Sequence, residues 1–129
     1  MITADQLLAH ATGDYLLQSD WMANEKTSKS LAALAHALSY TVPFLFLTSS
    51  WPALAVIAGT HFVIDRWRLA RYVVWAKNLL GPKRFRYSWA ECKATGYHKD
   101  RPPWMAVWLL IVADNVMHVA INGLALRYL

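Results

Sequence analysis

Apolar residues run through most of this chain, and polar stretches divide them into four segments. Their helical spacing predicts four helices, over about residues 3–19, 28–48, 51–79 and 103–128. Thr3 or Asp5 suits the N-terminal cap of the first helix. Pro43 lies inside the second helix, which we expect it to kink. The polar stretch 81–102 is expected to form a loop between the third and fourth helices.

The length and apolar character of these segments favour a membrane protein. A helix needs about 20 apolar residues to cross a bilayer, and the fourth segment meets this requirement. The second and third segments are marginal alone, but the short link "TSSWP" makes them a natural hairpin of two spans. The first segment is the shortest. We therefore predict an all-α fold, a compact four-helix integral membrane bundle in a single domain over residues 1–129.

Composition supports this class over a soluble four-helix bundle, which is the alternative. The chain is 57% hydrophobic and 16% charged, whereas soluble domains are about 45–50% apolar and about 25% charged. No segment outside the loops shows the broad charged face that a soluble bundle needs. The lipid bilayer is therefore the first expected partner, and a homo-oligomer is compatible with this class.

Positive charge is concentrated in one part of the chain. The net charge is +5, and ten of the thirteen Lys and Arg residues lie between Arg66 and Arg101. Because Lys and Arg gather on the cytoplasmic side of membrane proteins, we predict that the basic loop 81–102 is cytoplasmic and contacts anionic lipid headgroups. Aromatic residues interleave with these cations, as in single-strand nucleic-acid sites. The membrane interpretation explains the same residues, so we predict no nucleic-acid partner.

Histidine and aspartate recur within the apolar helices at a spacing of four residues. The three pairs are His10–Asp14, His61–Asp65 and Asp114–His118, and His36 adds a fourth histidine. Residues four apart lie on one helix face. At 1.5 Å rise per residue, all four helices bring these groups to a similar depth, roughly 10–20 Å below the predicted cytoplasmic ends. The pattern therefore predicts one shared internal site.

Burial of these carboxylates requires positive charge nearby. A charged group at bilayer depth costs roughly 2.5–3.5 kcal/mol, and no Lys or Arg is expected at the depth of the three aspartates. A divalent metal would compensate them, since imidazole nitrogen and carboxylate oxygen are ligands for zinc and also for manganese and iron. Seven candidate ligands exceed one zinc site, so we predict one or two ions, with zinc first. The candidates are His10, Asp14, His36, His61, Asp65, Asp114 and His118. A metal-free polar or proton network is the alternative.

The stretches "HATGDYLLQSDWMANEK", "HFVID" and "DNVMH" resemble an uncharacterised family of small phage and bacterial membrane proteins, the domain of unknown function 3307. Nearly the whole chain is covered. Asn115 stands where the family more often has Gln, and Arg68 where Lys is common. The other positions of the family pattern are His10, Asp14, Leu17, Gln18, Asp20, Lys26, His36, His61, Asp65, Asp114 and His118. The resemblance implies a bacterial inner-membrane location and brings no activity with it.

Two functions follow from the predicted site. The first is a metal-dependent membrane hydrolase that acts on a lipid-like or phosphoester substrate. Asp20 would be its general base, and Arg68 would face a substrate phosphate. The second is a non-enzymatic phage or bacterial membrane module. Its cluster would be a structural metal site or would relay protons or ions.

Overall fold

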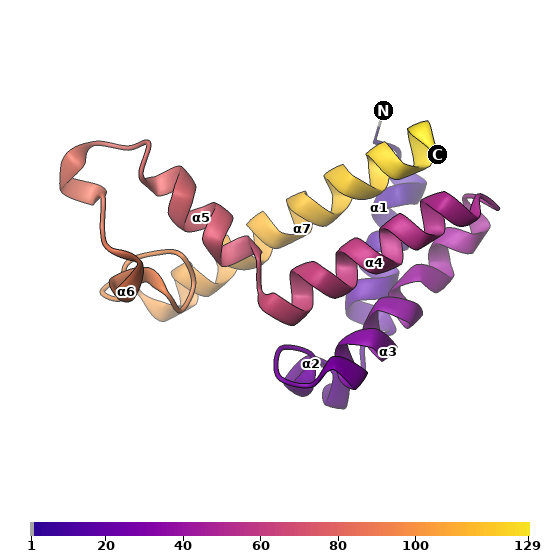
Figure 1. Ribbon diagram of the computed structural model, residues 1–129, viewed down its shortest axis with the longest axis horizontal. Coiled ribbons are helices and arrows are strands. Elements are labelled where there is room, and N and C mark those ends of the chain that lie inside the picture. Colours follow the sequence, from indigo (N-terminus) through magenta and orange to yellow (C-terminus); the bar gives the residue numbers. More distant parts are fainter. Residues whose placement is uncertain (1) are drawn as a thin grey trace. The chain divides into compact units, whose positions relative to one another are not determined.

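The computed structural model describes residues 2–129, and Figure 1 shows helices joined by loops. These residues form seven α-helices and three short π or 3-10 segments, with no strand among them, which confirms the predicted all-α class. The chain divides into two compact units. The first unit runs from the chain start to Trp67 and includes His118–Leu129, and the second unit is Arg68–Met117.

The first predicted helix begins where expected and changes its winding before it ends. Thr3 caps α1 (Ala4–Ala11), and its hydroxyl accepts a hydrogen bond from the backbone N–H of Gln6 at 3.2 Å. The chain continues as a π-helix, η1 (Thr12–Leu16), which is wider than an α-helix. Residues 17–19 then leave the helix, so the predicted end at residue 19 is wrong by about one turn. Another short helix, α2 (Asp20–Glu25), follows at once.

The second and third predicted helices form an antiparallel pair, visible side by side in Figure 1. The first of them, α3 (Ser30–Thr41), passes into a 3-10 turn, η2 (Val42–Phe46), at Pro43. Proline lacks the N–H that the α-helical pattern needs, which explains the change. After a short link, α4 (Trp51–Trp67) returns along α3. Three alanines of α3 that are at most 1% exposed permit this close packing: Ala32, Ala33 and Ala37.

The predicted third helix is broken at Arg68, so the expectation of one helix over 51–79 is wrong. Arg68 has a φ of 52°, and α5 (Ala70–Asn78) begins two residues later. A positive φ is unfavourable for a side-chain-bearing residue. The guanidinium of Arg68 donates a hydrogen bond to the Ala94 carbonyl at 3.0 Å. This contact within the second unit helps to hold the turn.

The predicted basic loop contains two short helical elements of the second unit. They are η3 (Lys83–Phe85) and α6 (Trp89–Cys92). Ser88 and Glu91 form a capping box at the start of α6, and these hydrogen bonds lower the pKa of the exposed Glu91 carboxyl. The Cys92 thiol is buried, which raises its pKa.

The predicted fourth helix agrees with α7 (Pro103–Tyr128). Among residues 2–129 it is the one helix long and apolar enough to cross a membrane, and its 26 residues span about 39 Å. Only 11% of its most apolar window is buried, unlike the core helix of a soluble protein. The other described helices are too short for this test. The expected compact bundle of four membrane-spanning helices is therefore not supported.

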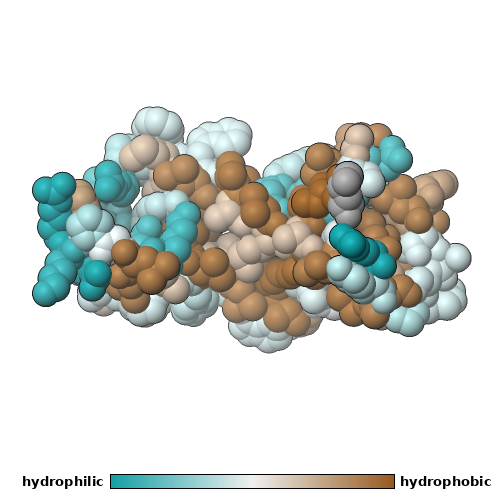
Figure 2. All heavy atoms as spheres, turned by 90° about the horizontal axis from the view of Figure 1, so that it is seen from above, coloured by the Kyte–Doolittle hydropathy of each residue, from teal (hydrophilic) through white to brown (hydrophobic). Residues whose placement is uncertain are grey.

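Large apolar side chains lie on the outside of the first unit. Figure 2 shows hydrophobic residues over much of the face in view. In the first unit alone, side chains that are at least half exposed include Leu8, Leu16, Leu31, Leu38, Phe46 and Trp51. Soluble monomers seldom expose apolar surface this widely.

The π-helix approaches α3 so closely that only glycine fits at the contact. A Cβ atom at Gly13 would lie 2.6 Å from the backbone oxygen of Tyr40. Gly59 of α4, in contrast, has no atom within 4 Å of the place where its Cβ would be. The position of η1 against α3 therefore depends on Gly13.

We expect Gly13→Ala to lower the free energy of unfolding by about 1–3 kcal/mol, because backbone must move to admit the methyl group. Thermal and denaturant unfolding of the purified chain would measure the change. The matched control, Gly59→Ala, should be neutral or slightly stabilising, since alanine is the better helix former in open space. Equal stability of Gly13→Ala and the parent chain would show that this contact does not position η1.

Candidate functional site

The interior of the first unit holds an unusual number of polar side chains. Eight polar or ionisable residues in this unit are at most 7% exposed. They come from α1, η1, α3, α4 and the last turns of α7, and they are Gln6, His10, Asp14, His36, His61, Asp65, His118 and Asn122. Buried charged groups are retained in proteins when they are paired or when they coordinate metals.

Four of these residues converge on one point. Asp14, His36, His61 and Asp65 each offer one ligand atom, and these four atoms lie within 4.8 Å of one another. His36 Nε2 lies 3.0 Å from His61 Nε2 and 3.2 Å from Asp14 Oδ1. Asp65 Oδ2 lies 3.3 Å from His36 Nε2 and 3.4 Å from His61 Nε2. The group combines two imidazoles and two carboxylates, and we call it the His₂Asp₂ group.

The spacing of these atoms fits a small divalent cation. Zinc binds histidine nitrogen and carboxylate oxygen at about 2.0–2.2 Å, so the edges of its tetrahedron measure about 3.3–3.6 Å. Within the His₂Asp₂ group, the histidine nitrogens lie 3.0 Å from each other and 3.2–3.9 Å from the carboxylate oxygens, and all four ligand atoms lie within 4.8 Å of one another. Two carboxylates would also balance the charge of a divalent ion. The residues present therefore fit such an ion in number, type and spacing.

Two further histidines lie next to the outer oxygens of the carboxylates. Asp65 turns Oδ2 towards the group, and its Oδ1 lies 3.2 Å from His118 Nε2. Asp14 turns Oδ1 towards the group, and its Oδ2 lies 4.0 Å from His10 Nε2. Polar partners of this kind orient metal-binding carboxylates. His10 and His118 therefore lie one step further out than the predicted ligand set assumed.

Lys26, directly after α2, places a positive charge beside the group. Its Nζ lies 2.6 Å from Asp65 Oδ2 and 3.2 Å from His36 Nε2, and its side chain is 19% exposed. With neutral histidines, two aspartates and one lysine leave a net charge of −1. The expectation that no lysine or arginine reaches this depth is therefore wrong. Lys26 partly compensates the carboxylates and would compete with a metal ion for Asp65.

Tyr40 connects the group to the rest of the buried polar side chains. Its ring stacks on His61 with centroids 3.6 Å apart and an interplanar angle of 14°. Its hydroxyl accepts a hydrogen bond from Asn122 Nδ2 at 2.6 Å and lies 2.8 Å from His10 Nδ1. The Nδ1 atoms of His36 and His61 have no hydrogen-bond partner among residues 2–129. Ring packing, rather than a hydrogen bond at Nδ1, therefore orients His61.

The predicted site left out three buried polar residues that follow the same spacing. Gln6 precedes His10 by four residues, Tyr40 follows His36 by four, and Asn122 follows His118 by four. Gln6 Nε2 donates to the Val119 carbonyl at 2.6 Å and so joins α1 to α7 within the first unit. Extending each histidine by one helical turn would have found all three.

The remaining predicted site residues are not members of the His₂Asp₂ group. Asp114 is four residues before His118 on α7, in the part of that helix that belongs to the second unit. Asp20 is exposed at the start of α2, outside the His₂Asp₂ group. Arg68 also belongs to the second unit, where it donates to Ala94. The proposed roles of Asp20 and Arg68 stay predictions.

Comparison with known families gave one match. The model of a family described as "protein of unknown function (DUF3307)" matches residues 2–121. The matched range contains the whole His₂Asp₂ group together with Lys26 and His118. Comparisons with curated proteins and with solved structures found no match.

Proposed function

This chain belongs to the DUF3307 family of unknown function, and we propose that it is a membrane protein whose buried His₂Asp₂ group binds a divalent metal ion. The observation that carries the proposal is the convergence of four ligand atoms from three different helical segments, all within 4.8 Å of one another. One ion would use the ligands Asp14, His36, His61 and Asp65, with His10 and His118 against the outer carboxylate oxygens. This assignment refines the predicted ligand set.

The ligand chemistry favours zinc, with manganese and iron as alternatives. Two imidazoles and two carboxylates would complete a four-coordinate zinc site. A thiolate ligand would favour softer ions, and the group contains none. The two aspartates and Lys26 together carry a net charge of −1, and a divalent ion would change the net charge of the site to +1. We propose a single ion, because the four ligand atoms surround one point.

The surface of the first unit supports membrane insertion. Large apolar side chains lie on its outside, which suits acyl chains as the surrounding solvent, and its buried charged groups have polar partners within the unit. We propose that α7 crosses the bilayer. The basic segment 81–102 would then lie at the cytoplasmic face of a bacterial inner membrane, as the positive-inside rule expects.

A metal-dependent hydrolase is the finer form of this proposal. A divalent ion, when bound, supplies a Lewis acid that polarises a phosphoryl or acyl oxygen. Asp14 lies in a π-helix, a feature common at functional sites. Asp20 and Arg68 are the candidates for proton abstraction and for contact with a substrate phosphate. A lipid-like substrate would suit the apolar surroundings of the first unit.

A metal-free polar network is the second candidate, and Lys26 is the observation that favours it. The 2.6 Å contact between Lys26 Nζ and Asp65 Oδ2 already pairs one buried carboxylate. In that case the cluster would hold the helices together or relay protons. The two candidates differ in what removal of Lys26 should do.

Protein purified in detergent without chelator should contain about one divalent ion per chain by inductively coupled plasma mass spectrometry. Asp65→Asn should lose most of this metal, because an amide is a poor ligand and leaves the charge unbalanced. Lys26→Met should keep the metal and bind it more tightly, since the competing cation is gone. The exposed carboxylate change Asp5→Asn is the matched control and should have no effect.

The metal-free candidate predicts the opposite result for Lys26. Removing one partner of a buried ion pair without a metal costs roughly 3–5 kcal/mol, so Lys26→Met should be strongly destabilised. Metal-free parent protein together with a destabilised Lys26→Met variant would reject the metal site.

The chain should stay with the membrane fraction after an alkaline carbonate wash, because α7 is inserted rather than adsorbed. Replacing Ile111 and Val112 by Lys, two exposed positions of α7, should release the chain or prevent its accumulation, since lysine in a span is costly. Lys93→Gln in the basic segment serves as a control and should fractionate like the parent. Full extraction of the parent by carbonate would contradict insertion.

Metal-loaded protein should hydrolyse phospholipids or acyl esters in mixed micelles, and His61→Ala should abolish turnover together with metal binding. Asp20→Asn should keep the metal and lower the rate by about 10²–10⁴ if Asp20 is the general base. Product release would be followed by mass spectrometry. A fully metal-loaded chain with no turnover would contradict the hydrolase and leave the structural metal site.

A further inference from the structure

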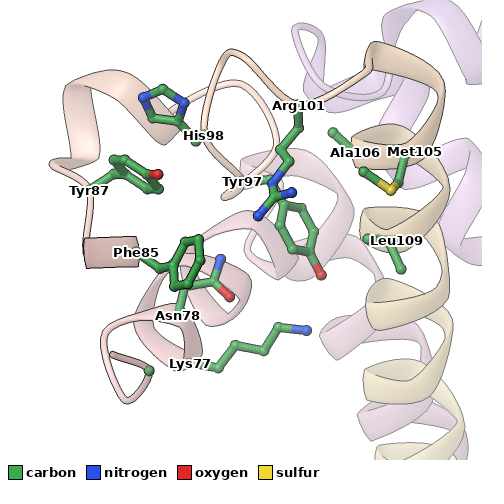
Figure 3. Close-up of a pocket in the computed structure, with 11 residues that line it drawn as sticks. Lys77, Asn78, Phe85, Tyr87, Tyr97, His98, Arg101, Met105, Ala106 and Leu109 are labelled. Atoms are coloured by element: carbon green, nitrogen blue, oxygen red, sulfur yellow. The ribbon is translucent and has the colours of Figure 1, made fainter. Parts of the chain in front are cut away.

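A second candidate site lies entirely within the second unit. A pocket of about 400 Å³ opens between α5, the segment that leads into α7, and the first turns of α7, as Figure 3 shows. This volume is within the range of small-molecule sites. None of the metal-binding candidates lines it, so its chemistry is independent of the His₂Asp₂ group.

Two cations and no carboxylate line this pocket. They are Lys77 of α5 and Arg101, which precedes α7. In Figure 3 the side chain of Arg101 extends towards the Tyr97 ring from above, and that of Lys77 lies below the ring. Lys77 Nζ lies 5.5 Å from the centre of that ring. Neither cationic side chain has a hydrogen bond or ion pair with residues 2–129, whereas Lys29 in the first unit pairs with Glu25 at 2.6 Å. The pocket thus presents two unpaired positive charges to a ligand.

Hydrogen bonds fix the walls that carry these cations. Asn78 Nδ2 donates to the Gly96 carbonyl at 3.2 Å, and Trp75 Nε1 donates to the Tyr87 carbonyl at 3.1 Å. Gly96 has a φ of 83°, and a Cβ there would lie 2.3 Å from the Arg71 carbonyl oxygen. The segment is therefore held tightly against α5, and the pocket is preformed.

The wall of the pocket that α7 forms is apolar. Met105, Ala106 and Leu109 of α7 line it, and Phe85 lies across from them. These turns belong to the helix that is apolar enough to cross a membrane. A ligand that fits both walls combines a negatively charged group with an apolar part.

We infer that this pocket binds the phosphate group of an anionic amphiphile, with Lys77 and Arg101 as the phosphate contacts. Guanidinium and ammonium groups bind phosphate through charge-assisted hydrogen bonds. The apolar part of the ligand would lie along Met105 and Leu109. The proposed membrane location makes a lipid the expected source of this phosphate, and a soluble phosphate compound is the other source. The inference rests on that location for the source alone and does not depend on the metal site.

Isothermal titration calorimetry of the full chain in an uncharged detergent tests this inference. The probes are dioctanoyl phosphatidic acid, dioctanoyl phosphatidylcholine and inorganic phosphate. We expect the phosphatidic acid to bind best and its dissociation constant to rise by about tenfold or more in Lys77→Gln/Arg101→Gln. The control Lys93→Gln/Arg127→Gln removes the same charge outside the pocket and should bind like the parent.

Each other outcome overturns part of the inference. Equal weakening in both double variants would assign the binding to net charge rather than to the pocket. If phosphatidylcholine bound as tightly as phosphatidic acid, binding would be due to the apolar wall alone and not to the two cations. No binding of any probe would reject the site. Inorganic phosphate bound as tightly as phosphatidic acid would keep the phosphate site and reject the lipid source.

The metal content of the same preparations separates this inference from the proposed function. Lys77→Gln/Arg101→Gln should contain as much metal as the parent, because neither residue belongs to the first unit. Loss of lipid binding with unchanged metal would be specific to the pocket.

Discussion

Two carboxylates buried in the first unit, Asp14 and Asp65, set the constraint on which the rest of that unit depends. Removing an ionised carboxylate from water costs several kcal/mol unless nearby groups compensate it. Here the inner oxygens meet His36 and His61, and the outer oxygens face His10 and His118. Lys26 supplies a full positive charge, with its Nζ 2.6 Å from Asp65 Oδ2. One lysine balances one aspartate, and the proposed divalent ion would compensate the other and leave a local charge of +1.

The backbone is built to deliver these groups. A π-helix turns Asp14 inwards, and the absence of a side chain at Gly13 lets that turn contact α3. On α3, His36 and Tyr40 lie one turn apart, so the same face provides a ligand and the ring that stacks on His61. The first unit buries this polar cluster beside an apolar core that includes Tyr40, Phe44 and Ile57, and it leaves other large apolar side chains on its surface.

The sequence predicted the helical class, the position of α7 and the convergence of His36, His61 and Asp65, because a spacing of four residues has one meaning on a helix. It did not predict the break at Arg68, since that positive φ is supported by a contact with Ala94, 26 residues away. It also left Lys26 out of the site. From the sequence, a lysine in a polar turn is expected to be solvated, and only the tertiary structure shows that Lys26 lies beside Asp65.

X-ray absorption spectroscopy at the metal edge of the full chain tests the central claim most directly, because it reports the atoms around the ion. We predict a shell of about four nitrogen and oxygen atoms at about 2.0–2.2 Å, with the outer scattering of two imidazole rings. His36→Ala should lose one imidazole contribution or the ion altogether. A shell of water oxygens alone, a shell with sulfur, or protein with no bound metal would contradict the account.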